Sequence, residues 1–376
     1  MASMLNNSEI HSLYQLVLGG AFFSALVLGY VLQKTNFCTM GAISDLILMG
    51  SATRLRQWLF AIAVSVLGFG LFHYFGLIKT QDAIYTAPKV LWLSTLLGST
   101  MFGFGMVLAS GCGGRNLIRI GSGSLRALVV MVLVGVFGQM TLRGVFGVVR
   151  VNTTDLVFFT LPTQQDLPSI LAYFLGIDTS LIALLTAIVV FLCIMTYIAQ
   201  DKDFFNFNNI QAGLFVGLAI IALWFVSGSL GYVEEDPNTL AQVYLATNTG
   251  RIEAASFVAP VSYALDYLSF FSDSSKKLTI GVMLVLGMIL GAFICAKVHG
   301  LMKWQGFNGL EDTANHLVGA ALMGFGGVTA VGCTIGQGLS GLSTLALNSF
   351  IAFPGFILGA YIGLQYLQWR LSPKPC

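Results

Sequence analysis

The chain has 376 residues, of which 56% are hydrophobic and only 9% are charged. Its 18 basic and 16 acidic residues are too few to cover the water-facing surface of a soluble fold of this length, which excludes a soluble globular protein. The net charge of +2 and the lack of a basic run argue against nucleic-acid binding. The composition therefore predicts an all-α, polytopic membrane protein whose apolar surface faces a lipid bilayer.

Nine apolar runs are long enough to cross about 30 Å of hydrocarbon. The first run has neither the basic start nor the small-residue exit of a cleaved signal peptide, so we expect it to be a retained helix. An odd number of crossings predicts that the two termini lie on opposite sides of the membrane. The runs are 13–33, 57–78, 90–109, 125–148, 180–199, 210–231, 278–298, 316–332 and 345–368.

The distribution of Lys and Arg among the loops predicts the orientation. Loops on the side of the N-terminus hold seven of these residues, and loops on the other side hold eleven. Because cytoplasmic loops are enriched in Lys and Arg, we expect a periplasmic N-terminus and a cytoplasmic C-terminus. The segments 152–179 and 232–277 then lie outside, and we expect them to be loops with interfacial helices that act as lids or spacers.

Three stretches rich in small residues interrupt the apolar pattern, each around one cysteine. Glycine costs about 1 kcal/mol relative to alanine inside a helix, so such clusters at membrane depth need a cause. The glycines before the cysteines suit close helix packing. Those around and after them predict re-entrant breaks, where backbone N–H groups line a cavity. The stretches are "NFCTMGAISD" (36–45), "GFGMVLASGCGGRN" (103–116) and "GFGGVTAVGCTIGQGLSG" (324–341).

The second and third stretches match each other at an offset of 221 residues. The match places Gly103-Phe104-Gly105 on Gly324-Phe325-Gly326, and Gly111-Cys112 on Gly332-Cys333. It predicts a single transmembrane domain, 1–376, built from two related halves, about 13–199 and 209–370, around a central pathway.

We expect each of the three cysteines to lie at the start of a short helical segment, where free N–H groups and the helix dipole attract anions. A buried thiol stays protonated and offers a soft sulfur with a weak S–H donor, which suits a sulfur-containing anion. Arg115 is expected either to add a cationic contact or to cap a helix. The candidate substrate-binding residues are Cys38, Cys112, Cys333, Gly111, Gly113, Gly332, Thr334 and Arg115.

The other cysteines predict no separate chemistry. Cys193 and Cys295 lie within apolar runs and are expected to be ordinary small core residues, whereas Cys376 in the tail is expected to be an exposed thiol. The chain has no C-x-x-C spacing, so we expect no metal site, no cofactor and no dithiol redox centre.

With these motifs in hand, the chain resembles the YeeE/YedE family of bacterial inner-membrane sulfur transporters over nearly its whole length, and its thiosulfate-uptake branch in particular. The most specific element is Gly332-Cys333-Thr334-Ile335-Gly336 followed by Gly338-Leu339. The resemblance implies an hourglass-shaped fold in which Cys38, Cys112 and Cys333 pass thiosulfate through the pore as a cysteine relay. It also implies a separate cytoplasmic sulfur carrier of the TusA-like type as partner.

Two rival functions remain open at this point. The transported species could be another sulfur or selenium compound, such as sulfide, sulfite or a selenium oxyanion. Alternatively, the protein could be a membrane sulfurtransferase that forms a persulfide on Cys112 or Cys333. The sequence favours transport over an enzyme, because catalysis needs an activated thiolate with a nearby base and none is visible.

Overall fold

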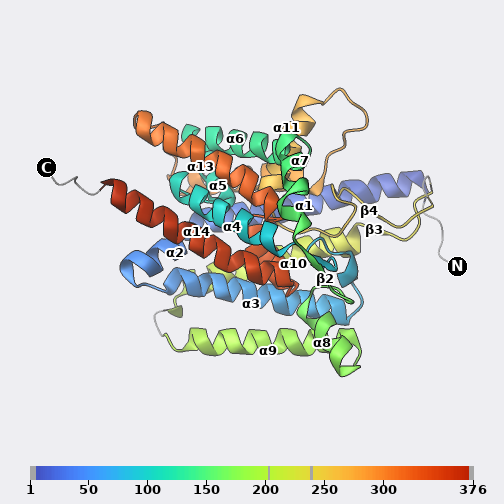
Figure 1. Ribbon diagram of the computed structural model, residues 1–376. Helices are drawn as coiled ribbons and strands as arrows, with labels where there is room; N and C mark the ends of the chain where they lie inside the picture. Colours follow the sequence, from blue (N-terminus) through green and yellow to red (C-terminus); the bar gives the residue numbers. More distant parts are fainter. Residues whose placement is uncertain (1–5, 202–203, 238–239, 372–376) are drawn as a thin grey trace.

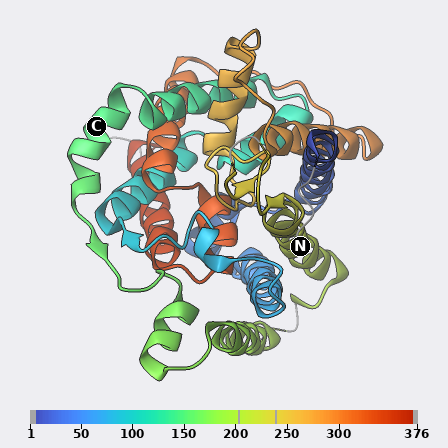
Figure 2. The ribbon, with the colours of Figure 1, turned by 90° about the vertical axis from the view of Figure 1, so that its right-hand side faces the viewer.

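The computed structural model describes residues 6–201, 204–237 and 240–371. Its long helices run roughly along one common axis, with the start of α1 (Asn7–Thr35) and the end of α14 (Leu347–Leu371) at opposite ends of the molecule (Figure 1). Figure 2 looks onto the end at which α1 begins. We call this end the N-terminal side and the opposite end the C-terminal side.

Within the described part of the chain, eight helical segments are long and apolar enough to cross a membrane. This confirms the expected all-α polytopic fold. Each of the nine apolar runs coincides with a helix, although one of these nine helices, α13, is not among the eight because its first turns are polar. The long helices after α1 are α3 (Thr53–Tyr74), α4 (Trp92–Leu108), α6 (Leu125–Leu142), α9 (Thr179–Ala199), α10 (Phe207–Phe225), α12 (Ile280–Val298), α13 (Leu310–Thr329) and α14.

Shorter elements connect and interrupt these helices. The run expected to extend to residue 148 ends at Leu142, because the chain turns at Gly144 and begins a separate helix, α7. β1 pairs with β2, and β3 pairs with β4, both antiparallel. The short elements are α2 (Thr39–Ser44), η1 (Asp45–Met49), η2 (Thr80–Asp82), β1 (Lys89–Val90), α5 (Gly113–Gly121), α7 (Val145–Asn152), η3 (Thr154–Leu156), β2 (Phe159–Thr160), α8 (Leu167–Leu175), η5 (Val226–Leu230), β3 (Tyr232–Val233), β4 (Val243–Tyr244), α11 (Val258–Ser269) and η6 (Gly336–Gly341).

The two interrupted helices, α4 and α13, pack antiparallel on each other through glycine. A Cβ atom on Gly98 would lie 2.5 Å from the backbone nitrogen of Ala330 and 2.7 Å from the carbonyl oxygen of Gly326, and one on Gly105 would lie 2.7 Å from the carbonyl oxygen of Gly319. Only glycine permits such an approach of two backbones. The offset of 221 residues matches Gly98 with Gly319 and Gly105 with Gly326. The contact of Gly98 with Gly326 in one direction therefore corresponds to the contact of Gly319 with Gly105 in the other. A duplicated unit would produce this symmetry, although the division into halves stays a prediction.

The segment 232–277 is more than a lid or spacer. It includes β3, β4 and α11 on the N-terminal side (Figures 1 and 2), but its middle part enters the helix bundle. Ile252, Ala255 and Phe257 are each 0% exposed, and a Cβ on Gly113 would lie 3.5 Å from the Cβ of Phe257. The segment therefore reaches the helix that follows Cys112.

Candidate functional site

Both glycine–cysteine stretches break their helices in the same way. At the end of α4, the N–H groups of Ala109, Ser110 and Gly111 donate to the carbonyl oxygens of Gly105, Val107 and Met106. At the end of α13, the N–H groups of Ala330, Val331 and Gly332 donate to those of Gly326, Val328 and Gly327. Ser110 and Val331 both take left-handed backbone angles, with φ of 55° and 57°. The expected breaks are thus confirmed, and each turns the chain immediately before its cysteine.

Each of the three cysteines begins a helical segment, as expected. Cys38 precedes α2 and its sulfur accepts the N–H of Gly41 at 3.4 Å. Cys112 precedes α5. Cys333 accepts the N–H of Gly336 on its sulfur at 3.4 Å, and its carbonyl oxygen accepts the N–H of Gln337 at 2.8 Å. The thiols of Cys38 and Cys333 therefore accept N–H groups at the positive ends of short helical segments, whereas the side chain of Cys112 accepts none from the described residues.

Burial and proximity connect the three thiols. Cys38, Cys112 and Cys333 are 9%, 2% and 0% exposed. Cys112 lies within electrostatic range of both other thiols, and its sulfur is 4.0 Å from the hydroxyl of Thr39, the neighbour of Cys38. Cys112 therefore lies near both other cysteines.

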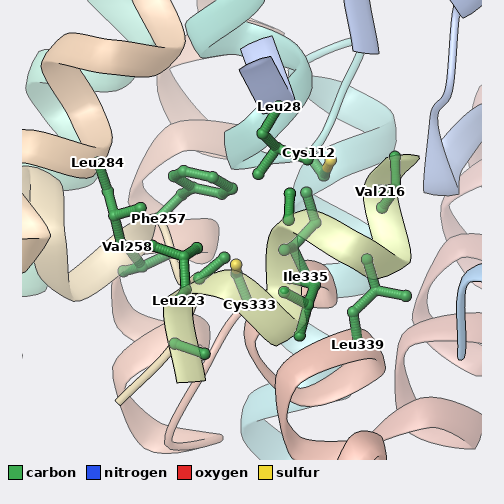
Figure 3. Close-up of a cluster of buried hydrophobic side chains, with 14 of the residues drawn as sticks. Leu28, Cys112, Val216, Leu223, Phe257, Val258, Leu284, Cys333, Ile335 and Leu339 are labelled. Atoms are coloured by element: carbon green, nitrogen blue, oxygen red, sulfur yellow. The ribbon is translucent and has the colours of Figure 1, made fainter. Parts of the chain in front are cut away.

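Apolar side chains enclose the thiols of Cys112 and Cys333. Cys112 and Cys333 lie in one cluster with Phe257, Ile335 and Leu28 (Figure 3). Hydrophobic side chains that close a passage also exclude water from it, as in channel constrictions. We call this apolar region around Cys112 and Cys333 the waist.

A cavity of about 200 Å³ lies on the N-terminal side of this waist. Gly332, which directly precedes Cys333, lines it, as do Gly327 and Val331 of the same break. Its remaining walls come from the loops after α3 and η5 and from the ends of α6, α7, α11 and α12. Polar and charged groups that line it are Tyr85, Arg150, Asn248, Thr249, Glu253, Ser256 and Tyr263. We call this cavity the outer vestibule.

Basic side chains surround Cys38 at the other end of the thiol series. Arg115 and Arg119 both act electrostatically on Cys38. Arg115 donates through Nη2 to the side-chain oxygen of Asn36 at 3.3 Å, and its buried Nη1 has no hydrogen-bond partner in the described structure. The guanidinium of Arg54 lies against Gly41, since a Cβ there would be 2.6 Å from its Nη1. An anion beside Cys38 would therefore meet positive charge.

The remaining candidate residues have distinct local roles. Gly111 lies against the side chain of Arg115, at 3.0 Å for an added Cβ, so its lack of a side chain makes room for that residue. Gly113 is the first residue of α5. Thr334 is 1% exposed, and its hydroxyl has no hydrogen-bond partner among the described residues. An unpaired hydroxyl directly after Cys333 is available to a ligand.

Sequence reasoning missed the residues that connecting segments bring to the outer vestibule and the waist. Tyr85, Glu253 and Phe257 come from segments expected to lie outside the bundle, and Tyr85 interacts electrostatically with both Cys333 and Glu253. The one available signal was the apolar stretch "AASFVAP" (254–260), which is unusual in a solvated loop.

The other cysteines lie away from this site. Cys295 is 0% exposed and belongs to the core, as expected. Cys193, expected to be buried, is exposed, because α9 contacts the bundle through α3 and α8 and leaves its remaining faces open. Cys376 lies outside the described residues.

Interrupted membrane helices that meet at buried thiols, below a polar vestibule, define a polytopic membrane transport protein. The family comparison agrees: the family model described as Sulphur transport matches residues 34–362. The chain belongs to this sulphur-transport family, which the sequence motifs had indicated.

The full-length relatives are transporters. The chain is 25% identical to the thiosulfate transporter TsuA of Escherichia coli strain K12, over 96% of this chain and 97% of that protein. It is 26% identical to the thiosulfate transporter TsuA of Spirochaeta thermophila, over 88% of this chain and 93% of that protein. A probable transporter YedE of Salmonella typhimurium is 31% identical over 29% of this chain and 25% of its own length. These likenesses identify a sulfur transporter and not an enzyme.

Proposed function

We propose that the protein takes up thiosulfate through the outer vestibule and then past Cys333, Cys112 and Cys38 in turn. The observation that carries the proposal is the burial of all three thiols at the starts of short helical segments, with the sulfur of Cys112 4.0 Å from the hydroxyl of Thr39 beside Cys38. A thiol offers a soft, polarisable sulfur and a weak S–H donor, and both suit a sulfur-containing anion. The two full-length relatives named as thiosulfate transporters support this choice of substrate.

Polar groups next to the thiols would complete the contacts to the anion. The free hydroxyl of Thr334 would donate to it beside Cys333, and Nη1 of Arg115 would donate to it at the end near Cys38. The backbone at the two breaks is left accessible to the anion by residues without side chains, namely Gly111, Gly113 and Gly332. Several weak sites in series allow the anion to bind and still leave.

The proposed direction is inward, across a bacterial inner membrane with a periplasmic N-terminus and a cytoplasmic C-terminus. Moving a dianion into a negative interior costs about 4.6 kcal/mol per 100 mV, twice the roughly 2.3 kcal/mol for one charge. A separate cytoplasmic sulfur carrier of the TusA-like type would offset this cost by consuming the anion. The cluster of basic residues around Cys38 would present the anion to that partner.

Uptake of labelled thiosulfate into proteoliposomes tests the thiols. Cys112→Ala and Cys333→Ala should each lower uptake by about tenfold or more, the factor given by a loss of about 1.4 kcal/mol in binding the passing anion. Cys193→Ala is the matched control, because Cys193 is exposed on α9, and it should transport normally. Normal uptake by a double Cys112→Ala, Cys333→Ala variant would refute the relay.

The same vesicles separate thiosulfate from its rivals. Unlabelled sulfide, sulfite and selenium oxyanions are added in excess, and thiosulfate should compete best. A better competitor would identify another substrate. Mass spectrometry after substrate exposure should show no added sulfur on Cys112 or Cys333, whereas a persulfide would indicate sulfurtransfer.

A further inference from the structure

Among the described residues, the outer vestibule is lined by one carboxyl group, that of Glu253, which lies on the proposed path of the anion. The backbone fixes its position: the N–H of Ile252 donates to the carbonyl oxygen of Asp82, and the N–H of Ile84 donates to that of Ile252, both at 3.0 Å. Ile252 and Ala254 on either side are 0% and 4% exposed. The backbone that carries Glu253 is therefore anchored in the vestibule wall.

The surroundings of Glu253 do not neutralise it. Its Oε1 accepts the backbone N–H of Asn248 at 3.4 Å, and within the described residues no Lys, Arg or His pairs with it. Arg150 of α7 lines the same vestibule, but it is paired with Asp155 at 2.8 Å. The other titratable groups that face the vestibule or act on Glu253 and its neighbours are Tyr85 from the loop after η2, Tyr263 from α11, Arg143 beside Tyr263, and Cys333 beyond Tyr85.

Burial raises the pKa of Glu253 to about 7. Below that pH the carboxyl is neutral and can donate an O–H hydrogen bond to an oxyanion. Above it the carboxylate is an acceptor only, and it repels an anion in a confined space of low dielectric. The two protonation states thus have opposite effects on an anion in the vestibule.

We propose that Glu253 is a proton-binding site that controls access to the thiol pathway: the protonated carboxyl admits the anion and the ionised carboxylate excludes it. The inference rests on the proposed thiosulfate uptake and adds a second ligand, the proton, to the same pathway. By linkage, proton binding at Glu253 strengthens anion binding, and anion binding strengthens proton binding by the same factor.

The first test measures initial uptake of labelled thiosulfate at external pH 6 and pH 8, with internal pH and membrane potential held constant. Because the binding-competent, protonated fraction of one group falls about tenfold between these values, wild-type uptake at low substrate should also fall about tenfold. Glu253→Gln is permanently neutral and keeps a donor, so its ratio of rates should be close to one. Glu311→Gln is the control: Glu311 pairs with Arg370 on the C-terminal side, and this variant should keep the wild-type ratio.

A second test counts protons directly. Thiosulfate binding to the detergent-solubilised protein at pH 8, measured by calorimetry in buffers of different ionisation enthalpy, should take up about one proton in the wild type and none in Glu253→Gln. Three results would each overturn the proposal. The wild type could show equal uptake rates at pH 6 and pH 8, or it could take up no proton on binding thiosulfate. Glu253→Gln could also keep the same pH dependence of uptake as the wild type.

Two further outcomes are also decisive. A folded Glu253→Gln protein that binds no thiosulfate would count against admission by a neutral side chain. If that variant does not fold, the wild-type ratio and proton count still decide. Failure of the proposed function would look different, because the wild type would then take up no thiosulfate at either pH.

Discussion

The contact between α4 and α13 supports a sharp prediction, because it positions the break that precedes Cys333. In Gly98→Ala, the added methyl would lie 2.5 Å from the backbone nitrogen of Ala330 and 2.7 Å from the carbonyl oxygen of Gly326. Neither atom belongs to a flexible side chain. The two helices must therefore separate, and the turn from Ala330 to Cys333 must move with them.

The size of the effect follows from this geometry. Relieving the overlap requires a shift of roughly 0.5–1 Å, and such overpacking typically costs about 1–3 kcal/mol. Alanine returns up to about 1 kcal/mol through its higher helix propensity. We expect a net loss of about 1–2 kcal/mol in stability, together with a larger loss of uptake, because the thiol of Cys333 would be displaced from its path.

Gly19→Ala provides the matched control, since Gly19 lies in α1 and an added Cβ there meets nothing within 4 Å. Both variants are purified in detergent, and their thermal unfolding midpoints and thiosulfate uptake are compared with the wild type. Gly98→Ala should unfold at lower temperature and transport poorly, and Gly19→Ala should do neither. Equal midpoints and equal uptake for the two variants would refute the reasoning.

Three further substitutions test single groups. Thr334→Val removes a buried hydroxyl that has no partner among the described residues, so it should not lower the unfolding midpoint. It should weaken thiosulfate affinity by about fivefold, which corresponds to the loss of a hydrogen bond of about 1 kcal/mol. Unchanged affinity would show that Thr334 does not contact the anion. Arg115→Gln should lower uptake by about tenfold or more, since a charged hydrogen bond contributes about 1.5–3 kcal/mol, and uptake equal to the wild type would leave Arg115 a helix cap. Ser343→Ala deprives the buried indole N–H of Trp224 of its acceptor at 2.9 Å; it should cost about 1–3 kcal/mol of stability, and an unchanged midpoint would contradict this.

The bilayer explains why the main helices could be predicted from the sequence. Backbone groups cannot remain unpaired in hydrocarbon, so an apolar run of sufficient length has to form a helix. The breaks were predictable for the same reason, because a glycine cluster at membrane depth is tolerated only where it serves packing or a cavity. Cys112 and Cys333, which follow such clusters, could therefore be assigned to helix starts.

The vestibule could not be predicted, because several of its residues, Glu253 among them, come from loops. The position of Glu253 depends on a backbone bridge between Ala83 and Ile252, which joins segments about 170 residues apart, and no local pattern encodes such pairing. The same holds for Phe257, whose burial against α5 is a tertiary contact. Cys193 was misassigned for a related reason: hydropathy does not distinguish a lipid-facing side from a protein-facing side of a helix.

The two ends of the thiol series differ in charge, and this difference bears on direction. The outer vestibule presents a carboxyl group, Glu253, whereas the end near Cys38 presents Arg115 and Arg119. If binding strengthened steadily toward the arginines, the anion would be held there, and uptake would depend on a partner that removes it. If instead protonation of Glu253 sets the rate, uptake would follow external pH whatever the partner does. Because access comes before removal, initial uptake should follow external pH even in vesicles without a partner, and the partner should change only the sustained uptake.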